Sequence, residues 1–414
     1  MRDASVNVGP DWRVLDEIDF VRLSKLNFNV AEPEDVATYG FVNYYDKSYD
    51  RVNTHLERQL QHIDRVKYET TTSDDPVIQQ FIKDGEATVF ATDSILALLM
   101  CSPRTAYPWD IVINRIDDRV VFDKREGGVF DYVTVNENTA DPPMETGDKD
   151  NINSPSALSM EATFINQHFA FQVINEEEKY EFENPNPFAV EDNEPLASCG
   201  YRYRRFDLTT KQAAAAADDE EEPDEVTLIV RTEVDAAVAN PNLQGGEPTF
   251  ITVHALNEFD PKAQGAGNAL DWRQKLDMQR GAVVATEMKN NSAKLARWAV
   301  QAILAGADQM KLGYITRANP KDNNRHAILG TQSYKPREFA GQMNVTLTNG
   351  WGIVKAVVDM CLRLPEGKYV LVKDPNKSIL RFYSVPIHTF EEESHHVEEE
   401  EQHFEEEEPV DAEK

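Results

Sequence analysis

The chain has 414 residues and a mass of 46.9 kDa, and 41% of its residues are hydrophobic, which is enough for a large core and excludes a wholly disordered chain. Its 42 Lys and Arg stand against 73 Asp and Glu, so the net charge of −31 excludes a generally basic surface for nucleic acid. No apolar run approaches the roughly 18 residues of a membrane span, and the three cysteines have neither metal-ligand nor disulfide spacing, so we expect an intracellular protein outside membranes.

Apolar patterns of period 2 and period 3.6 alternate between polar stretches and predict the elements of the fold. In chain order these are a helix at 93–102, a hairpin at 110–122, an acidic loop insertion at 137–155, a helix from Ser154 to Phe169, an acidic low-complexity loop at 211–225, strands at 226–235, 249–256, 281–289, 310–317 and 325–331, helices at 292–306 and 350–363, a hairpin at 368–385 and a disordered acidic tail at 391–414. The predicted fold is α+β, with a mixed central β-sheet flanked by helices in one domain over residues 1–390.

The charge is distributed unevenly along the chain. Residues 218–225 and 391–414 are strongly acidic, whereas residues 271–337 carry twelve Lys or Arg against five acidic residues. A basic segment in an acidic protein indicates an anionic partner, although a solvated basic surface would have the same composition.

Two short patterns place ionisable residues at the ends of predicted strands, Glu233-Val234-Asp235 and Glu287-Met288-Lys289. Residues i and i+2 of a strand share a face, so each pattern sets two ionisable side chains side by side. Glu233, Asp235 and Glu287 could together bind Mg²⁺ or Mn²⁺, with Lys289 facing a phosphate. The alternative is that these residues form the solvated outer face of a sheet.

Long strings of sequence carry a family resemblance. They are DWRQKLDMQRGAVVATEMKNNSAKLARWAVQAILAG from Asp271, then RHAILGTQSYKPREFAGQMN and LPEGKYVLVKDPNKSILRFYSVP. From about Asp11 to Phe390 the chain resembles the d-type subunits of eukaryotic translation initiation factor three. Members of that family usually carry an N-terminal arm that docks on the rest of the factor, and since no counterpart is found here we expect Met1 to begin a shortened chain.

The resemblance implies a fold like that of the decapping 5′-to-3′ exonucleases, with a tunnel for the 5′ end of an mRNA. Their GΦxΦΦE motif is similar to residues 156–161, which end in Glu161. Their EhD and EhK motifs resemble Glu233-Val234-Asp235 and Glu287-Met288-Lys289, and a further segment resembles residues 301–306, which begin with Gln301. The resemblance therefore implies that these motif residues line a cap pocket.

An mRNA cap presents a cationic 7-methylguanine and an anionic triphosphate bridge. The base calls for aromatic stacking and a carboxylate, and the bridge for Lys, Arg or a metal. The further pocket candidates are Trp272, Arg273, Lys275, Arg280 and Tyr314, while the candidates for the RNA backbone are Arg202, Arg204, Arg205, Lys294 and Arg297. Trp298 fits a core position better than a stacking platform, and the arginines of 202–205 could instead guard a sheet edge.

The predicted function is that of a non-enzymatic cap-binding subunit in the cytoplasm. The resemblance implies three partners, which are the capped 5′ end of mRNA, the other subunits of the initiation factor and the small ribosomal subunit. This function requires no cofactor. If the carboxylates do bind a metal ion, we expect it to be Mg²⁺ or Mn²⁺. The alternatives are a metal-dependent decapping or 5′-end nuclease, which Glu233, Asp235, Glu287 and Lys289 alone would favour, and a purely structural subunit. The acidic residues 137–155 resemble in position the family's mobile insertion over the RNA path, and we expect them to suppress RNA binding until displaced.

Overall fold

The computed structural model describes residues 1–211, 223–242 and 245–391. Most of the predicted low-complexity loop and all but one residue of the predicted tail therefore lie outside the described residues. None of the helices in these three ranges is long and apolar enough to cross a membrane.

The strands of the described chain join in one mixed sheet. They are β1 (Arg13–Asp19), β2 (Glu34–Tyr45), β3 (Arg58–Gln59), β4 (Val89–Thr92), β5 (Asp110–Ile116), β6 (Arg119–Asp123), β7 (Ile174–Glu181), β8 (Cys199–Asp207), β9 (Thr227–Val234), β10 (Ala236–Val238), β11 (Thr249–Glu258), β12 (Gln309–Asn319), β13 (Asp322–Tyr334), β14 (Gly367–Lys373) and β15 (Ile379–Val385). Their order is β1-β15-β14-β5-β6-β4-β9-β8-β2-β10-β11-β12-β13-β3, and β7 pairs with β2. Most pairs are antiparallel, while β4 runs parallel to both β6 and β9, β11 parallel to β12, and β10 parallel to β2.

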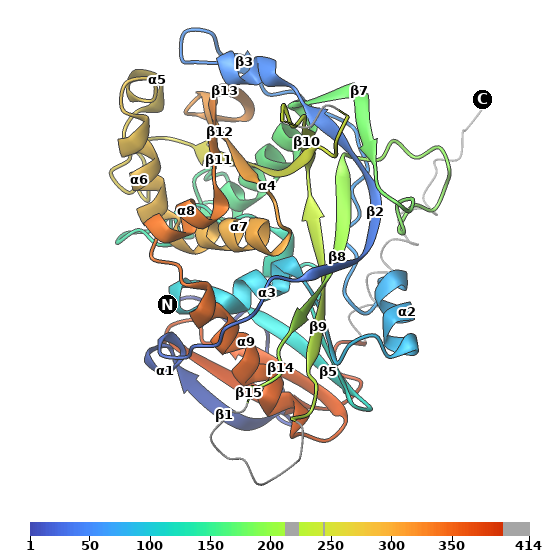
Figure 1. Cartoon of the computed structure of the whole chain (residues 1–414). Coiled ribbons are helices and arrows are strands. Elements are labelled where there is room, and N and C mark those ends of the chain that lie inside the picture. Colours follow the sequence, from blue (N-terminus) through green and yellow to red (C-terminus); the bar gives the residue numbers. More distant parts are fainter. Residues whose placement is uncertain (212–222, 243–244, 392–414) are drawn as a thin grey trace, which may run out of the picture.

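The helices lie on both sides of this sheet. They are α1 (Phe20–Ser24), α2 (Pro76–Asp84), α3 (Asp93–Met100), α4 (Pro155–Gln172), α5 (Trp272–Lys275), α6 (Arg280–Asn290), α7 (Ser292–Leu304), α8 (Pro336–Gln342) and α9 (Leu347–Leu362), with 3₁₀ turns at η1 (Lys47–Arg51), η2 (Ser102–Arg104) and η3 (Val129–Asp131). Helix α3 packs against both α7 and α9, and α4 packs on β11. Figure 1 shows these helices on one side of β8 and β9 and α2 on the other.

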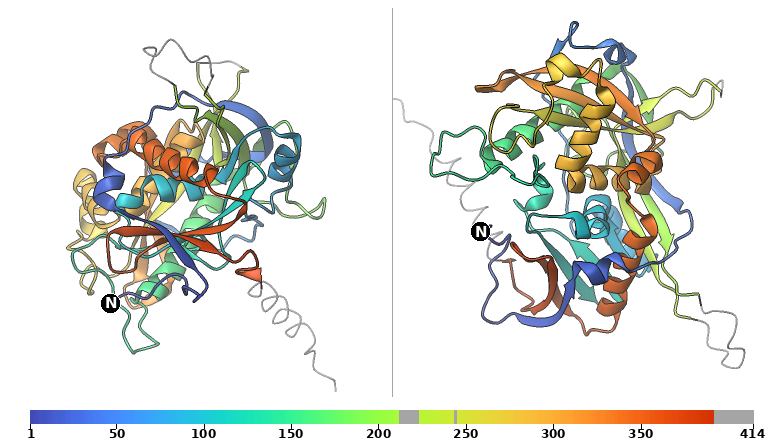
Figure 2. Two further views of the ribbon diagram at one scale, coloured as in Figure 1. Left: turned by 90° about the horizontal axis from the view of Figure 1, so that it is seen from below. Right: turned by 90° about the vertical axis from the view of Figure 1, so that its left-hand side faces the viewer.

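The two ends of the sheet lie far apart in all the views of Figures 1 and 2. Strands β11, β12 and β13 form one end, β1, β14 and β15 form the other, and β8 and β9 run between them. The main hydrophobic core fills the space that the sheet encloses, with Leu96, Trp351 and Leu312 among its buried members. The mixed sheet flanked by helices confirms the predicted fold class.

The structure corrects one predicted element, because residues 281–289 form helix α6 and not a strand. The buried residues of α6 are Val283, Val284, Glu287 and Asn290, a spacing of three and four that is helical. Val283-Val284 favoured a strand, but the run does not alternate strictly between apolar and polar residues. On a helix, positions i and i+2 point in different directions. Glu287 is accordingly buried and Lys289 is exposed to solvent.

Candidate functional site

A pocket of about 260 Å³ lies where the end of β9 meets β11, α3, α4 and α7. Five of the residues predicted from the sequence line it, namely Glu233, Asp235, Lys294, Arg297 and Gln301. The pocket is also lined by two irregular segments, residues 67–72 before α2 and residues 129–133 after β6. It therefore brings together groups from segments far apart in the chain.

Glu233 and Asp235 both line this pocket, Glu233 near the end of β9 and Asp235 between β9 and β10. The backbone N–H of Asp235 donates to the carbonyl of Ile251, and one Asp235 carboxylate oxygen accepts from the N–H of Val253 at 2.7 Å. The neighbouring Asp93, at the start of α3, accepts from the N–H of Glu233 at 3.3 Å. The predicted placement of Glu233 and Asp235 on one face agrees with the structure.

A lysine that the sequence did not single out stands between the two carboxylates. Lys67 Nζ lies 3.2 Å from Glu233 Oε2 and 4.0 Å from Asp235 Oδ1. The charge of Glu233 raises the pKa of Lys67 well above its usual value. Burial alone would raise the pKa of Glu233, but Lys67 and Arg231 hold it below the ordinary value. Lys67 and Glu233 are therefore both charged at neutral pH.

The other cations of the pocket also have partners. Lys294 Nζ donates to the carbonyl of Thr134 at 2.9 Å, Arg297 lies 3.8 Å from the buried Glu137, and Lys124 pairs with Asp131. Burial lowers the pKa of Lys294 to about 8, although Glu287 opposes this shift. Five cationic and five acidic side chains line the pocket, so its formal charges balance. The sequence had led us to expect an excess of positive charge.

Burial and the charge of Glu233 raise the pKa of Asp93 to about 7. A protonated Asp93 would remove one of the five negative charges and leave the pocket slightly positive at neutral pH. His254 is uncharged there, because burial lowers its pKa to about 3.

The aromatic residues of the pocket differ from those predicted. Trp272 and Tyr314 are fully buried and meet edge to face with ring centroids 5.5 Å apart, and neither lines the pocket. Trp298 does line the pocket, but its ring stacks on His254 at 4.4 Å and is buried, as expected of a core residue. Tyr132 lines the pocket and is 48% exposed, which leaves part of its ring accessible to a ligand.

Two carboxylates of the predicted motifs lie outside the pocket. Glu161 is buried in an ion pair with Arg317 at 2.7 Å, and its other oxygen lies 3.0 Å from His326 Nε2. Glu287 accepts from Asn291 Nδ2 at 3.0 Å, and the charge of Lys294 partly offsets the rise that burial causes in the pKa of Glu287. Of the predicted basic residues, Arg273 pairs with Glu57, Lys275 and Lys289 are exposed, and Arg280 donates to the carbonyl of Thr331 at 3.1 Å.

The arginines of β8 hold the end of helix α7. Arg202 Nη1 donates to the carbonyl of Ala305 at 2.6 Å, and Arg204 Nη1 donates to that of Leu304 at 2.9 Å. Both also pair with Asp35, each at 2.8 Å. Arg205 points to the other face and pairs with Glu34 and Glu86. None of the three lines the pocket, and the contacts of Arg202 and Arg204 stabilise the carbonyl end of the helix.

The residues of the pocket do not suit a divalent cation. Glu287, the predicted third ligand, does not line it, and an ammonium group stands between the two remaining carboxylates. Within the described part of the chain no group of three or more His, Cys, Asp or Glu side chains is arranged to hold a metal ion. Mg²⁺ and Mn²⁺ favour several oxygen ligands, which this arrangement does not offer.

The sequence pattern gave almost no indication that several residues of the pocket would lie there. Asp93 was predicted only as the start of a helix, and Lys67, Lys124 and Tyr132 lie outside regular elements. Arg231 lies inside β9, where a lone charged residue in an apolar strand is the one signal that could have marked it.

Comparison with known proteins gives relatives over almost the whole chain. Residues 1–384 match the family model described as eukaryotic translation initiation factor 3 subunit 7 (eIF-3). The chain is 58% identical over 402 residues to the D-type subunit of eukaryotic translation initiation factor 3 from Botryotinia fuckeliana (strain B05.10), an alignment that covers 95% of this chain and 68% of that protein. It is 56% identical over 403 residues to the corresponding protein of Mycosarcoma maydis, with 95% and 67% covered.

A solved structure shares the fold. Rai1 of Scheffersomyces stipitis, in complex with (3′-NADP)⁺ and calcium ion, superposes with a TM-score of 0.51 at 11% identity, and the match covers 94% of this chain and 95% of that chain. At this identity the likeness concerns the fold alone.

Proposed function

The chain belongs to the family of eukaryotic translation initiation factor 3 subunit 7, and from this premise we propose that it binds the capped 5′ end of mRNA without cleaving it. Membership gives it a role in translation initiation as one subunit of a larger factor. The cap as ligand, the recruitment of selected mRNAs to the small ribosomal subunit and the cytoplasm as location are our proposals.

The observation that carries the proposal is the combination of groups in one pocket. Glu233, Asp235 and Asp93 supply carboxylates, Lys124 and Arg297 supply positive charge, and Tyr132 supplies a half-exposed aromatic ring. A methylated guanine carries a positive charge, so it favours an aromatic face and a carboxylate, whereas its phosphates favour Lys and Arg. Few other parts of an RNA molecule call for a carboxylate, a cation and an aromatic ring within one small pocket.

The polar face of α4 can add specificity. Thr163, Asn166 and Gln167 line the pocket at helical spacing, and Asn166 Oδ1 already accepts from the N–H of Ala255 at 3.0 Å. Neutral donors and acceptors of this kind read the edge of a base without adding charge.

The test compares capped and uncapped RNA of one sequence by fluorescence anisotropy. We expect the capped RNA to bind more tightly, and we expect Tyr132→Ala to weaken that binding about tenfold, since stacking of a base on an aromatic ring contributes about 1–3 kcal/mol. Tyr132→Phe should retain the affinity. Ile116→Ala is the matched control, because Ile116 is 49% exposed on the β5–β6 hairpin and does not line the pocket. Equal affinity for capped and uncapped RNA would overturn the proposal.

A metal-dependent nuclease is the second candidate, because Glu233 and Asp235 line one pocket and could hold a catalytic cation there if Lys67 moved away from them. Incubation with cap-labelled RNA, with and without Mg²⁺ or Mn²⁺, separates the two functions. Release of the labelled cap that disappears in Glu233→Gln would establish the nuclease. Crosslinking without release supports the binding protein.

A further inference from the structure

The contacts of Lys67 resemble those that a bound cation would make. Its ammonium group lies within 4.0 Å of carboxylate oxygens of both Glu233 and Asp235, at the end of β9. Asp235 directs its other oxygen to the N–H of Val253, so the oxygen that faces Lys67 is the one open to a cation. The Lys67 side chain is 26% exposed, and this exposed part lines the pocket.

The segment that carries Lys67 is fixed on both sides, although it has no regular structure. Before Lys67, the N–H of Val66 donates to the carbonyl of Pro195 at 2.9 Å. After it, the carbonyl of Thr70 accepts from Arg231 Nη2 at 2.6 Å, and the N–H of Thr72 donates to Asp123 at 3.2 Å. The backbone therefore holds the lysine at its position.

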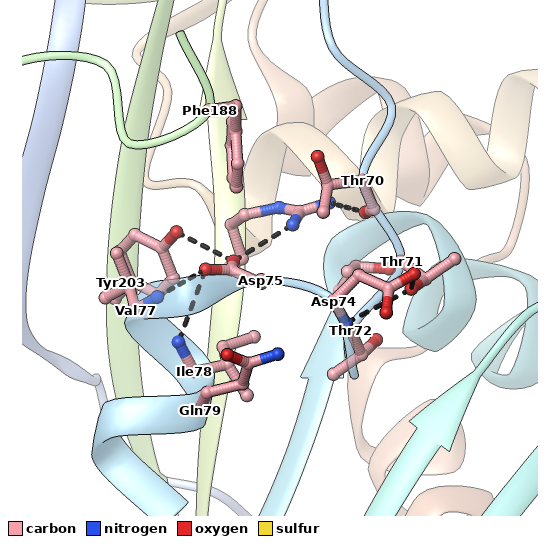
Figure 3. Close-up of polar contacts among 12 residues, drawn as sticks. Thr70, Thr71, Thr72, Asp74, Asp75, Val77, Ile78, Gln79, Phe188 and Tyr203 are labelled. Carbon is pink, nitrogen blue, oxygen red and sulfur yellow. Dashed lines mark hydrogen bonds and ion pairs between the residues drawn. The ribbon is translucent and has the colours of Figure 1, made fainter. Parts of the chain in front are cut away.

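Arg231 is itself fixed by a buried network, which Figure 3 shows around Asp75. Asp75 accepts from Arg231 Nη1 at 3.0 Å and from the hydroxyl of Tyr203 at 2.8 Å, and it caps α2 through the N–H groups of Val77 and Ile78. Asp75 is fully buried. This buried pair positions the segment of Thr70 through Arg231 and, with it, Lys67.

Two of the elements around the carboxylates, β11 and α4, add no further acid to the pocket. Strand β11 presents Thr252 and His254 to the pocket, and α4 presents Thr163, Asn166 and Gln167, all of them uncharged. Three further acids line the pocket, Glu69, Asp93 and Asp131, but among the described residues no third acid is arranged with Glu233 and Asp235 to hold a metal ion. A divalent cation there would thus have to displace the ammonium group and bind to two carboxylates alone.

We propose that Lys67 is a built-in replacement for a divalent cation. Its ammonium group neutralises Glu233 and Asp235, excludes divalent cations from the end of β9 and makes ligand binding in the pocket independent of them. This inference concerns the free protein and does not depend on which ligand the pocket takes.

The test measures binding of Mn²⁺ by electron paramagnetic resonance to the wild type, Lys67→Ala and Lys67→Arg. We expect the wild type and Lys67→Arg to bind no Mn²⁺ in the pocket, since both keep a cation there. Lys67→Ala should bind one Mn²⁺ at least about tenfold more tightly than the wild type, because the two carboxylates then lie together without the ammonium group that neutralises them. The double variant Lys67→Ala/Asp235→Asn should lose this gain, and it also measures the background from acidic segments elsewhere in the sequence.

Two results would overturn the proposal. One is wild-type binding of Mn²⁺ that is as tight as in Lys67→Ala and is lost in Asp235→Asn. The other is a folded Lys67→Ala that gains no Mn²⁺ binding. If circular dichroism shows that Lys67→Ala does not fold, the comparison of the wild type with Asp235→Asn still decides, because the proposal requires equal Mn²⁺ uptake by both. Absence of capped-RNA binding would overturn the proposed function and leave these results unchanged.

Discussion

At the scale of single residues, Glu258 shows how burial alters a carboxyl group. It is 8% exposed and accepts hydrogen bonds from the hydroxyl of Thr316 at 2.7 Å and the N–H of Trp272 at 2.9 Å, both of them uncharged donors. Burial raises its pKa to about 7. In the unfolded chain the pKa would be close to 4.5, so between these values the folded state holds the proton more tightly.

We therefore expect Glu258 to make the protein less stable as the pH rises from about 4.5 to 7. Glu258→Gln, which keeps an acceptor oxygen but cannot ionise, should gain stability relative to the wild type by about 2 kcal/mol between pH 5.5 and 7.5. Urea denaturation at the two values of pH measures the gain. Glu177→Gln, on an exposed part of β7, is the control and should show no such trend. A constant difference between the wild type and Glu258→Gln would contradict the pKa shift.

The residues of the pocket show how far side-chain positions follow from sequence. Alternation along a strand was enough to place Glu233 and Asp235 together, because that rule is local. It failed for Glu287 and Lys289, since it was applied to residues that form a helix. Lys67 could not be found at all, because only the pairing of distant segments brings it to the end of β9.

At the scale of elements, the end of helix α7 is held by another strand. The last carbonyl groups of a helix lack partners within it and carry partial negative charge. Arg202 and Arg204 donate to two of them, and Asp35 pairs with both arginines. Gly306 follows with φ +66°, and a Cβ there would lie 2.7 Å from Arg204 Nη1. Glycine at this position thus allows both the left-handed turn and the close approach of Arg204.

We expect Arg204→Met to lower the free energy of unfolding by about 2 kcal/mol, because it removes the donor to the carbonyl of Leu304 and leaves Asp35 with one partner fewer. Arg205→Met is the matched control on the same strand. Its partners Glu34 and Glu86 are 67% and 45% exposed, so we expect a loss under about 1 kcal/mol. Chemical denaturation measures both. If Arg204→Met is as stable as the wild type but binds uncapped RNA more weakly, the result would instead favour the role in binding the RNA backbone that was predicted from the sequence.

The elements themselves were predictable where the local pattern was unambiguous. Residues 249–256 and 292–306 were predicted within a few residues of β11 and α7, because each has one dominant apolar period. Strand β2, with twelve residues, was not predicted, since its half-buried run does not alternate regularly between apolar and polar side chains. The order of strands in the sheet depends on contacts between distant segments, which no local pattern contains.

At the scale of the whole molecule, a net charge of −31 is combined with a proposed polyanionic ligand. Part of this charge lies in residues 141–150, which are mostly exposed and belong to the acidic insertion at 137–155. The first residues of the insertion and those just before it are held in place. Asn136 makes hydrogen bonds with Asn291, between α6 and α7, and the N–H of Asn138 donates to the carbonyl of Asn290, the last residue of α6. The insertion joins residues 129–133 to α4, both of which line the pocket. Its charge therefore acts near the proposed ligand.

We expect Asp141→Asn/Asp148→Asn/Asp150→Asn to strengthen the binding of capped RNA by about two- to fivefold at low salt, because it removes repulsion without changing the residues that hold the insertion in place. The gain should vanish near 1 M salt, where the screening length falls to about 3 Å. Anisotropy titrations at two salt concentrations measure this. Neutralising Asp16 on β1, Asp84 at the end of α2 and Asp118 in the β5–β6 turn gives the same change in net charge away from the insertion (Figure 1) and should have a smaller effect. Equal gains from both variants would argue against a local role of the insertion.

The pairing of β1 with β15 has a consequence for how the protein is made. Residues 13–19 join the sheet through residues 379–385, which leave the ribosome more than 350 residues later. At roughly 5–20 residues per second, the first strand waits on the order of 20–70 s for its neighbour. During that time Ile18, buried in the finished protein, has no strand to cover it. A polypeptide that stops short of β15 carries a permanently unpaired first strand, which nascent-chain chaperones and proteases could recognise as the sign of an incomplete product.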